Sequence, residues 1–97
     1  MDVFLDDRRQ TPLGWTRVYW PDQAIALLEA GGVTRISLDY DLGNEARGTG
    51  LDVLHWLRRA VEDGLQAPKI MIHTGDPHGR AEMQKVLDEI LVLVGRQ

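Results

Sequence analysis

Acidic residues follow two short apolar runs of this 97-residue chain, at points where a β-strand would end. Asp6 and Asp7 come directly after Val3-Phe4-Leu5, and Asp39 comes directly after Ile36-Ser37-Leu38. If the two runs are neighbouring parallel strands, their carboxyl ends meet at the edge where open α/β sheets bind ligands. Three carboxylates held close together repel one another unless a proton or a cation intervenes, and a hard divalent cation takes oxygen ligands. The sequence therefore predicts a phosphate-handling site that binds Mg²⁺ or Mn²⁺.

The composition limits the classes of protein to which this chain belongs. It has 11 basic and 15 acidic residues, a formal net charge of −4, and therefore no overall basic field that would attract nucleic acid. A nucleotide substrate is still compatible with this charge, because a metal ion can bridge to phosphate. The absence of cysteine excludes disulfides, zinc–thiolate sites and cysteine nucleophiles. No signal-peptide pattern precedes the first strand, and no apolar run approaches the ~20 residues of a membrane span, so we expect a cytoplasmic protein without a membrane partner.

Hydrophobic spacing predicts strands that alternate with helices. Apolar and β-branched runs predict strands near residues 1–5, 15–20, 33–39 and 69–73. Apolar residues at offsets of three and four predict helices near residues 21–30, 51–63 and 77–91. We therefore expect one domain over residues 1–97 with a flavodoxin-like α/β fold, a three-layer sandwich whose short, mainly parallel sheet is covered on both faces by helices joined through right-handed crossovers.

The order of these strand ends resembles the receiver domain of two-component signalling. Receivers place an acidic pair after the first strand, a phospho-accepting aspartate after the third and a threonine or serine after the fourth. The resemblance implies that Asp6 and Asp7 hold Mg²⁺, that Asp39 matches the phosphoacceptor and that Thr74 matches the switch hydroxyl. It also implies that Asp41, two residues past the acceptor, gives its backbone carbonyl to the metal.

Two departures from receivers point to a divergent branch of this superfamily. Receivers carry a lysine after a fifth strand, whereas the only lysines here are Lys69 and Lys85 and the predicted sheet lacks a fifth strand. The chain is similar over about residues 1–92 to the cyclic-phosphate-processing receiver-like domains. Their motifs occur here in order, as Leu5-Asp6-Asp7-Arg8, Ser37-Leu38-Asp39-Tyr40-Asp41-Leu42-Gly43, Gly48-Thr49-Gly50 and His73-Thr74. Members of this branch often carry histidine where Tyr40 stands.

His73 ends the predicted fourth strand, and two roles are open to it. It is either a structural histidine bonded to a backbone carbonyl or a general acid or base acting on a phosphodiester. Neighbouring carboxylates would raise its pKa and favour the acid role. His55 lies in the middle of a predicted helix, where we expect a structural role.

Several residues near this edge are candidates for binding a substrate phosphate. Thr74 and Gly75 offer a hydroxyl and backbone N–H groups beside a helix N-terminus, an arrangement that suits an anion. Arg80, in the first turn of that helix with His78, either clamps a phosphate or lies solvated on the surface. Arg8 either pairs with Asp41 or reaches a substrate phosphate. Trp15 and Trp20 are interpreted as capping and core residues rather than as platforms for bases.

Two functions fit these residues. The first is a metal-dependent enzyme that hydrolyses or opens a cyclic phosphate on a nucleotide, an ADP-ribose derivative or an RNA end, with Asp39, His73 and Thr74 as its catalytic residues. The second is a degenerate receiver module that binds Mg²⁺ and a partner without turnover. An uncovered sheet edge favours pairing with a protein partner or with a second copy of the chain.

Overall fold

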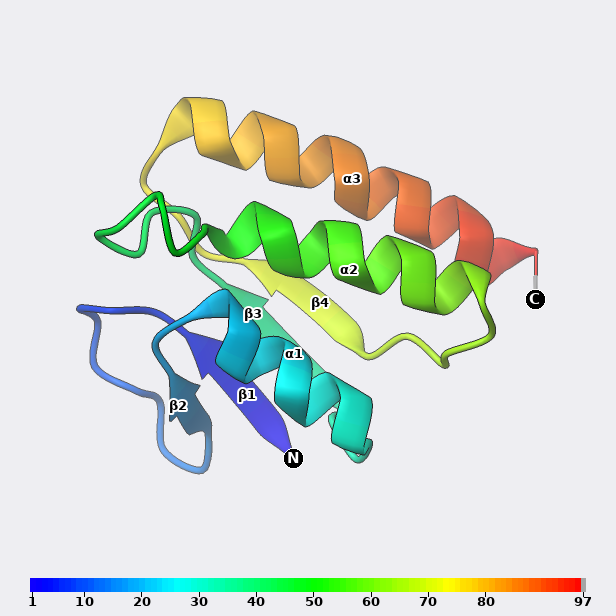
Figure 1. The fold of residues 1–97 in the computed structure, drawn as a ribbon, viewed down its shortest axis with the longest axis horizontal. Helices are drawn as coiled ribbons and strands as arrows, with labels where there is room; N and C mark the ends of the chain where they lie inside the picture. Colours follow the sequence, from blue (N-terminus) through cyan, green and yellow to red (C-terminus); the bar gives the residue numbers. More distant parts are fainter. Residues whose placement is uncertain (97) are drawn as a thin grey trace.

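The computed structural model describes residues 1–96, which alternate strands and helices in the expected order (Figure 1). All strand pairs are parallel, and the sheet order is β2-β1-β3-β4. The expected α/β, receiver-like fold is confirmed, and no fifth strand occurs among the described residues. The elements are β1 (Asp2–Leu5), β2 (Thr16–Val18), α1 (Pro21–Ala30), β3 (Arg35–Leu38), α2 (Gly50–Glu62), β4 (Lys69–Ile72) and α3 (Pro77–Gly95).

The three helices lie side by side on one face of the sheet. From β2 to β3 and from β3 to β4 the chain moves across the sheet in the same direction, so right-handed crossovers place α1 and α2 on the same face. α3 follows the last strand and packs along α2 (Figure 1). The expectation of helices on both faces is therefore wrong within residues 1–96. Its physical reason is the connection from β1 to β2, the one step in the opposite direction, which is a loop at residues 6–15 without a helix.

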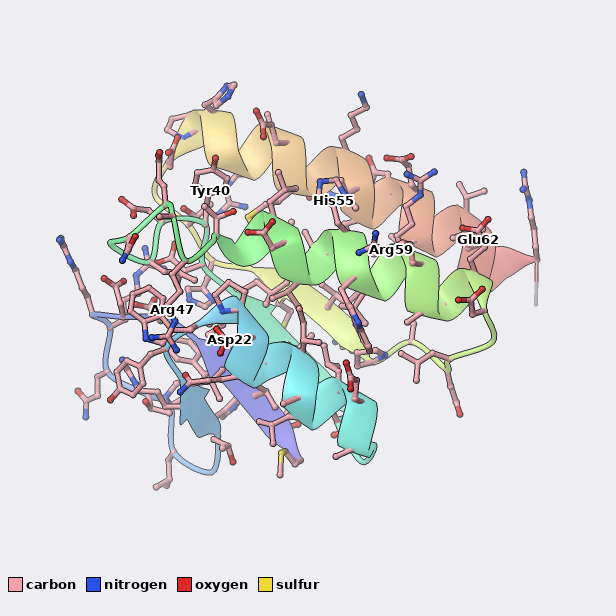
Figure 2. The ribbon with its side chains drawn as sticks, in the orientation of Figure 1. Asp22, Tyr40, Arg47, His55, Arg59 and Glu62 are labelled. Atoms are coloured by element: carbon pink, nitrogen blue, oxygen red, sulfur yellow. The ribbon has the colours of Figure 1, made fainter. Side chains whose placement is uncertain are left out.

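The entry into α1 shows how a surface arginine covers an aromatic ring. Pro21 occupies the first helical position directly after Trp20, where its missing N–H costs nothing. The Arg47 guanidinium lies 4.5 Å from the Trp20 ring centroid and 3.5 Å from the Asp22 carboxylate (Figure 2). Trp20 therefore acts as a helix-capping and packing residue, in agreement with the sequence interpretation. None of the described helices has the length and apolarity that crossing a membrane requires.

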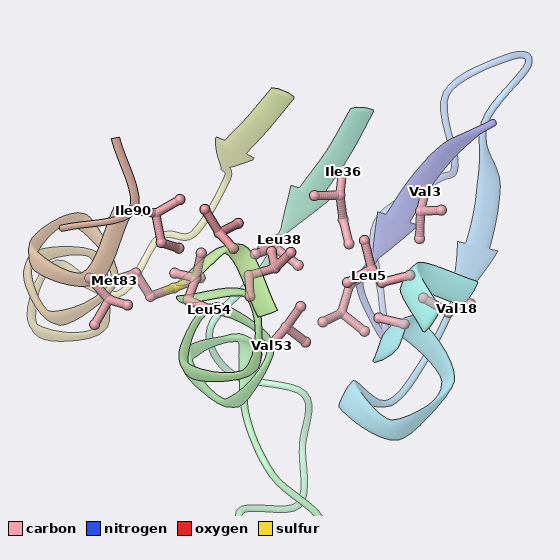
Figure 3. Packing of buried hydrophobic residues seen from close by; sticks show 14 of the residues in the cluster. Val3, Leu5, Val18, Ile36, Leu38, Val53, Leu54, Met83 and Ile90 are labelled. Carbon is pink, nitrogen blue, oxygen red and sulfur yellow. The ribbon is translucent and has the colours of Figure 1, made fainter. Parts of the chain in front are cut away.

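The hydrophobic core lies between the sheet and the three helices (Figure 3). Alternation along each strand sends every second side chain to this side, and the register Val3↔Ile36 and Leu5↔Leu38 aligns the two central strands. These four side chains are fully buried against residues of α2 and α3 such as Leu54. Burial of each such side chain contributes roughly 1.5–3 kcal/mol, so this face carries most of the stability of the fold.

The other side of the sheet, which we call the helix-free face, carries polar and aromatic side chains. Its only large buried residue is Phe4, and the His73 ring stacks on it in parallel with a centroid separation of 4.5 Å. The Trp15 ring packs edge-on against Phe4, with 6.4 Å between the ring centroids. The rings of His73 and Trp15 therefore cover Phe4 where a helix would otherwise lie. By register, this face comprises Asp2, Phe4, Arg17, Arg35, Ser37, Lys69 and Met71.

Candidate metal and phosphate site

The strands β1, β3 and β4 end at the same level, and the residue after each of them faces the same point. Leu5, Leu38 and Ile72 are register partners on β1, β3 and β4, so the next residues are Asp6, Asp39 and His73. One ligand atom from each of these residues lies within 4.8 Å of the other two. Of the three carboxylates predicted to converge, Asp6 and Asp39 do so, whereas His73 and not Asp7 completes the group. Because side chains alternate along a strand, all three lie on the same side of the sheet as the residues of the helix-free face.

Asp6 is fully buried and held in place by hydrogen bonds. One carboxylate oxygen, Oδ1, accepts from the backbone N–H groups of Arg8 at 2.8 Å and Arg9 at 3.0 Å. The other, Oδ2, lies 3.0 Å from His73 Nε2. Burial alone would raise the pKa of Asp6, but these hydrogen bonds outweigh it and leave the pKa below its ordinary value. Asp6 is therefore ionised at neutral pH and fixed in orientation.

His73 has both ring nitrogens engaged. Besides Nε2 at Asp6, its Nδ1 lies 2.6 Å from the hydroxyl oxygen of Ser37, a buried residue of β3. Since Asp6 is ionised, Nε2 carries the proton and donates to it, and Nδ1 accepts from the Ser37 hydroxyl. Burial lowers the pKa of His73, and the opposing attraction of Asp6 does not compensate. The expected rise of this pKa is therefore wrong, and His73 is neutral at pH 7.

Asp39 differs from Asp6 although their carboxylates are neighbours. Burial and the nearby charge of Asp6 raise the pKa of Asp39, while bonds from the Thr74 hydroxyl and the Tyr40 N–H act in the other direction. The Tyr40 N–H donates to Asp39 Oδ1 at 2.8 Å. Two carboxylates whose pKa values are pushed in opposite directions are typical of a site that holds a cation or moves a proton. Here Asp39 is the member that binds a proton more readily.

A cleft of about 410 Å³ opens over these strand ends, and it contains most of the candidate residues. Asp7 and Asp41 line it but are not part of the three-residue group. Arg8 pairs with Asp7 at 3.7 Å rather than with Asp41. The residues that line the cleft are Asp6, Asp7, Arg8, Arg9, Asp39, Asp41, Thr74, Gly75 and Asp76.

Arg9 is a cleft residue that the sequence did not single out. Its guanidinium donates to the backbone carbonyl of His73, and its Nε lies 4.0 Å from Asp6 Oδ2. It therefore ties the loop after β1 to the end of β4 beside the carboxylates. Arg8 and Arg9 are adjacent and chemically identical, so only the path of the loop distinguishes them.

Two predicted phosphate ligands lie outside the cleft lining. His78 pairs with Glu82 at 2.7 Å on the exposed side of α3. Arg80 donates from Nη2 to the backbone carbonyl of Thr74 at 3.1 Å, so it supports the turn between β4 and α3. The expected anion site at the N-terminus of α3 is filled by the chain itself, because the Asp76 carboxylate accepts from the N–H groups of His78 and Gly79. His55 is exposed on α2, in line with Arg59 and Glu62 and away from the cleft (Figure 2).

The Gly48-Thr49-Gly50 motif positions Asp39 and is not itself part of the cleft lining. A Cβ atom on Gly50 would lie 1.9 Å from the backbone oxygen of Asp39, so only glycine permits this approach of α2 to the end of β3. Thr49 caps α2 by accepting from the Leu51 N–H, and Gly50 donates to the Tyr40 carbonyl at 3.1 Å.

Tyr40, at the position where related domains often carry histidine, packs away from the cleft. A Cβ atom on Gly79 would lie 2.4 Å from Tyr40 Cγ, so the tyrosine ring rests directly on the backbone of the first turn of α3. Figure 2 shows it next to the start of this helix. Tyr40 therefore holds the loop after β3 against α3.

The group formed by Asp6, Asp39 and His73 fits a divalent cation. The two carboxylates offer one anionic oxygen each within a small volume, and the His73 Nε2–H, which donates to Asp6, orients one of them. Oxygen donors of this kind suit Mg²⁺ and Mn²⁺. A cation would also relieve the repulsion from Asp6, which adds to the effect of burial in raising the pKa of Asp39.

A parallel α/β sheet whose carboxyl edge gathers strand-end aspartates, a threonine and a metal-compatible group defines a receiver-like domain. The chain belongs to the cyclic-phosphate processing receiver domain family, whose profile matches residues 1–89. It matches no curated protein and no solved structure. The family expected from the sequence motifs is thereby confirmed.

Proposed function

We propose that this domain hydrolyses or opens a cyclic phosphate on a nucleotide, an ADP-ribose derivative or an RNA end. The observation that carries the proposal is the group of Asp6, Asp39 and His73 beside a polar cleft, in a family of cyclic-phosphate processing domains. Mg²⁺ or Mn²⁺ would be held by Asp6 and Asp39, with Asp7 and the backbone carbonyl of Asp41 as further ligands from the same cleft.

The reaction needs one bond made, one broken and one proton moved. The oxygen of a water molecule bonds to phosphorus, one P–O bond of the ring breaks, and the released sugar oxygen takes up a proton. A bound divalent cation would neutralise phosphate charge and ease the loss of the water proton. Asp39, whose carboxylate lines the cleft beside the proposed cation, is the residue suited to accept that proton as general base.

The other residues bind and orient in this proposal. Arg9 and the Gly75 N–H line the cleft as donors to phosphate oxygens, with Arg8 at its exposed rim, while the Thr74 hydroxyl donates to Asp39 and orients it. His73 acts through Asp6, because its Nε2–H already donates to that carboxylate and its Nδ1 is held by Ser37. We therefore assign His73 the role of a positioning residue.

The test is the formation of phosphate monoesters from a panel of cyclic phosphates, with Mg²⁺, with Mn²⁺ and with EDTA. The parent should turn over at least one member only with metal, and Asp39→Asn should reduce kcat/KM by about 100-fold or more. Asp63→Asn, which removes an exposed carboxylate after α2, is the matched control and should behave like the parent. Metal binding by the parent without turnover of any panel member would contradict an enzymatic role.

A non-catalytic module is the second candidate function. β4 is an edge strand of the sheet among the described residues, and beside it an apolar groove of about 380 Å³ runs between β4 and α3. Ile70 and Leu87 line this groove, and Leu91 there is 56% exposed. An unpaired edge next to apolar side chains suits a protein partner or a second copy of the chain. Sedimentation of the parent and of Leu91→Glu would distinguish this use from catalysis, since only the former requires the groove.

A further inference from the structure

The helix-free face is basic, although the whole chain is acidic. Its ionisable side chains are Arg17, Arg35 and Lys69, against the single acidic residue Asp2, whose carboxylate accepts hydrogen bonds from Nε and Nη2 of Arg35. The face therefore keeps an excess of two positive charges. The chain as a whole has a net charge of −4, so the excess of acidic residues lies in the cleft and the helical layer. A basic sheet face in an acidic protein indicates an anionic partner, because charge of one sign gathered on one face attracts the opposite sign.

Aromatic rings lie among these cations. The Arg35 guanidinium lies 4.8 Å from the Trp15 ring centroid, and the Arg17 guanidinium lies 5.2 Å from that of Tyr19 and 5.9 Å from that of Phe4. Tyr19 is 48% exposed and Trp15 is half-buried, so both rings remain partly accessible. Guanidinium groups next to aromatic rings combine a surface on which bases can stack with hydrogen-bond donors for phosphates.

This face continues into the cleft. Arg17 donates from Nη1 to the backbone carbonyl of Asp6 at 2.9 Å, and the Phe4 ring stacks on His73. Arg9 lines the cleft and bonds to the backbone of His73. An extended anionic ligand lying over Trp15 and Arg17 would therefore lead to the ends of β1 and β3, which carry Asp6 and Asp39.

The side chains of the helix-free face favour one kind of anionic partner, and they do not suit a covering helix. An amphipathic helix needs an apolar stripe to pack on, but Phe4 and Ser37 are already buried and the accessible side chains are mainly cationic. Single-stranded nucleic acid needs basic and aromatic side chains side by side. A terminal cyclic phosphate closes through a 2′-hydroxyl, so a strand that carries one is RNA.

We propose that the helix-free face binds a short single-stranded RNA segment whose terminal 2′,3′-cyclic phosphate enters the cleft. This inference rests on the proposed function and narrows its substrate class to RNA ends. Arg17, Arg35 and Lys69 contact phosphates. Tyr19 and the half-buried Trp15 stack with bases, so this proposal departs from the interpretation of Trp15 as a capping or core residue. With about three phosphate contacts, log Kd should change with log salt concentration with a slope of about 2.

The test compares two double variants that remove the same charges. Arg35→Gln/Lys69→Gln changes the helix-free face, and Arg59→Gln/Lys85→Gln changes exposed residues of α2 and α3. Binding of 5′-fluorescein hexauridylate is followed by anisotropy in EDTA at 50 and 200 mM salt, with circular dichroism melts as a check on folding. The first variant should weaken binding about tenfold, and the second less than twofold.

Turnover provides the second readout. The parent should process hexauridylate with a 2′,3′-cyclic phosphate end at a higher kcat/KM than uridine 2′,3′-cyclic phosphate. Arg35→Gln/Lys69→Gln should remove this preference and leave the mononucleotide rate unchanged. Equal binding by the two double variants, or equal kcat/KM of the parent for both substrates, would overturn the RNA proposal. Face-dependent RNA binding without turnover would support this face and overturn the proposed enzymatic function instead.

Discussion

The two faces of the sheet are built by alternate residues of the same strands, yet they have opposite roles. Val3, Leu5, Ile36 and Leu38 turn toward the helices and are completely buried. Their neighbours within the strands turn toward the helix-free face, where Phe4 and Ser37 are buried and both contact His73. One face therefore supplies the free energy of folding, and the other leads into the polar site.

This division explains why the site can be polar without unfolding the domain. Asp6, Asp39 and His73 continue the alternation of the helix-free face, so their mutual electrostatics lie outside the apolar core. Substitutions on the helix side should mainly lower the free energy of unfolding, and substitutions on the helix-free side should mainly weaken ligand binding. Four substitutions test this contrast.

The largest expected effect is on the helix side. Leu38→Ala removes a fully buried side chain from the centre of the core and should lower the free energy of unfolding by about 2–5 kcal/mol. Met71→Ala, the control on the helix-free face, removes a partly exposed side chain and should cost about 1 kcal/mol or less. Urea denaturation of both variants measures the difference. Equal losses would show that the two faces share the stabilisation.

Gly50→Ala should affect fold and site together. The new Cβ would overlap the backbone oxygen of Asp39, so α2 or the end of β3 must move at a cost of about 1–3 kcal/mol. Because that movement displaces Asp39, calorimetric titration should also show weaker Mg²⁺ or Mn²⁺ binding. Gly95→Ala, where a Cβ atom meets nothing within 4 Å, is the control and should leave metal binding unchanged. Parent-like melting and binding of Gly50→Ala would refute this reason for the motif.

Much of this architecture can be predicted from the sequence, because local patterns determine it. Apolar runs that stop on Asp6 and Asp39 predict parallel strands with adjoining ends, and the structure brings those two carboxylates together. The alternation of strands and helices predicts the fold class in the same way. What the pattern does not contain is the side of the sheet on which each helix packs. That depends on strand order, which only the complete topology fixes.

The details of the site depend on contacts between distant residues, and there the sequence was less informative. Proximity to carboxylates suggested a raised pKa for His73, but its burial beneath Phe4 and Ser37 has the larger effect. Arg9 and Arg8 are indistinguishable in the sequence, and only the loop places Arg9 against His73. The alternation of Arg35, Ser37 and Asp39 with Ile36 and Leu38 did contain a usable signal, namely a polar face on an otherwise apolar strand.

Ser37→Ala tests the link between the helix-free face and the metal group. Loss of the hydroxyl leaves Nδ1 of the half-buried His73 without its partner, which should cost about 1–2 kcal/mol of stability. Without this bond His73 no longer fixes Asp6, so Mn²⁺ affinity should fall about tenfold, the lower end for a residue that orients a ligand. Titration calorimetry and urea denaturation measure the two effects. Ser37→Thr keeps a hydroxyl and should restore both, and a tenfold loss in this variant too would assign the effect to packing.

The smallest expected change is a gain of stability on removing the charge of Asp39. Since the folded pKa of Asp39 is raised, the native metal-free protein holds that proton more firmly than the unfolded chain does. Stability therefore falls as the pH rises from the unfolded pKa, about 3.9, through the folded pKa. Asp39→Asn should abolish this loss and gain about 0.5–2 kcal/mol at neutral pH, but nothing at a pH below 3.9.

The same variant should respond less to metal, because a ligand stabilises only the native state that binds it. Thermal melts of Asp39→Asn and of the parent across a magnesium series, in EDTA and at several pH values, measure both effects. Asp63→Asn, which changes the net charge equally, should follow the parent throughout. An asparagine variant that melts below the parent in EDTA and gains as much from Mg²⁺ would make Asp39 a structural residue, and the helix-free side of the sheet edge would then not be the site of metal binding.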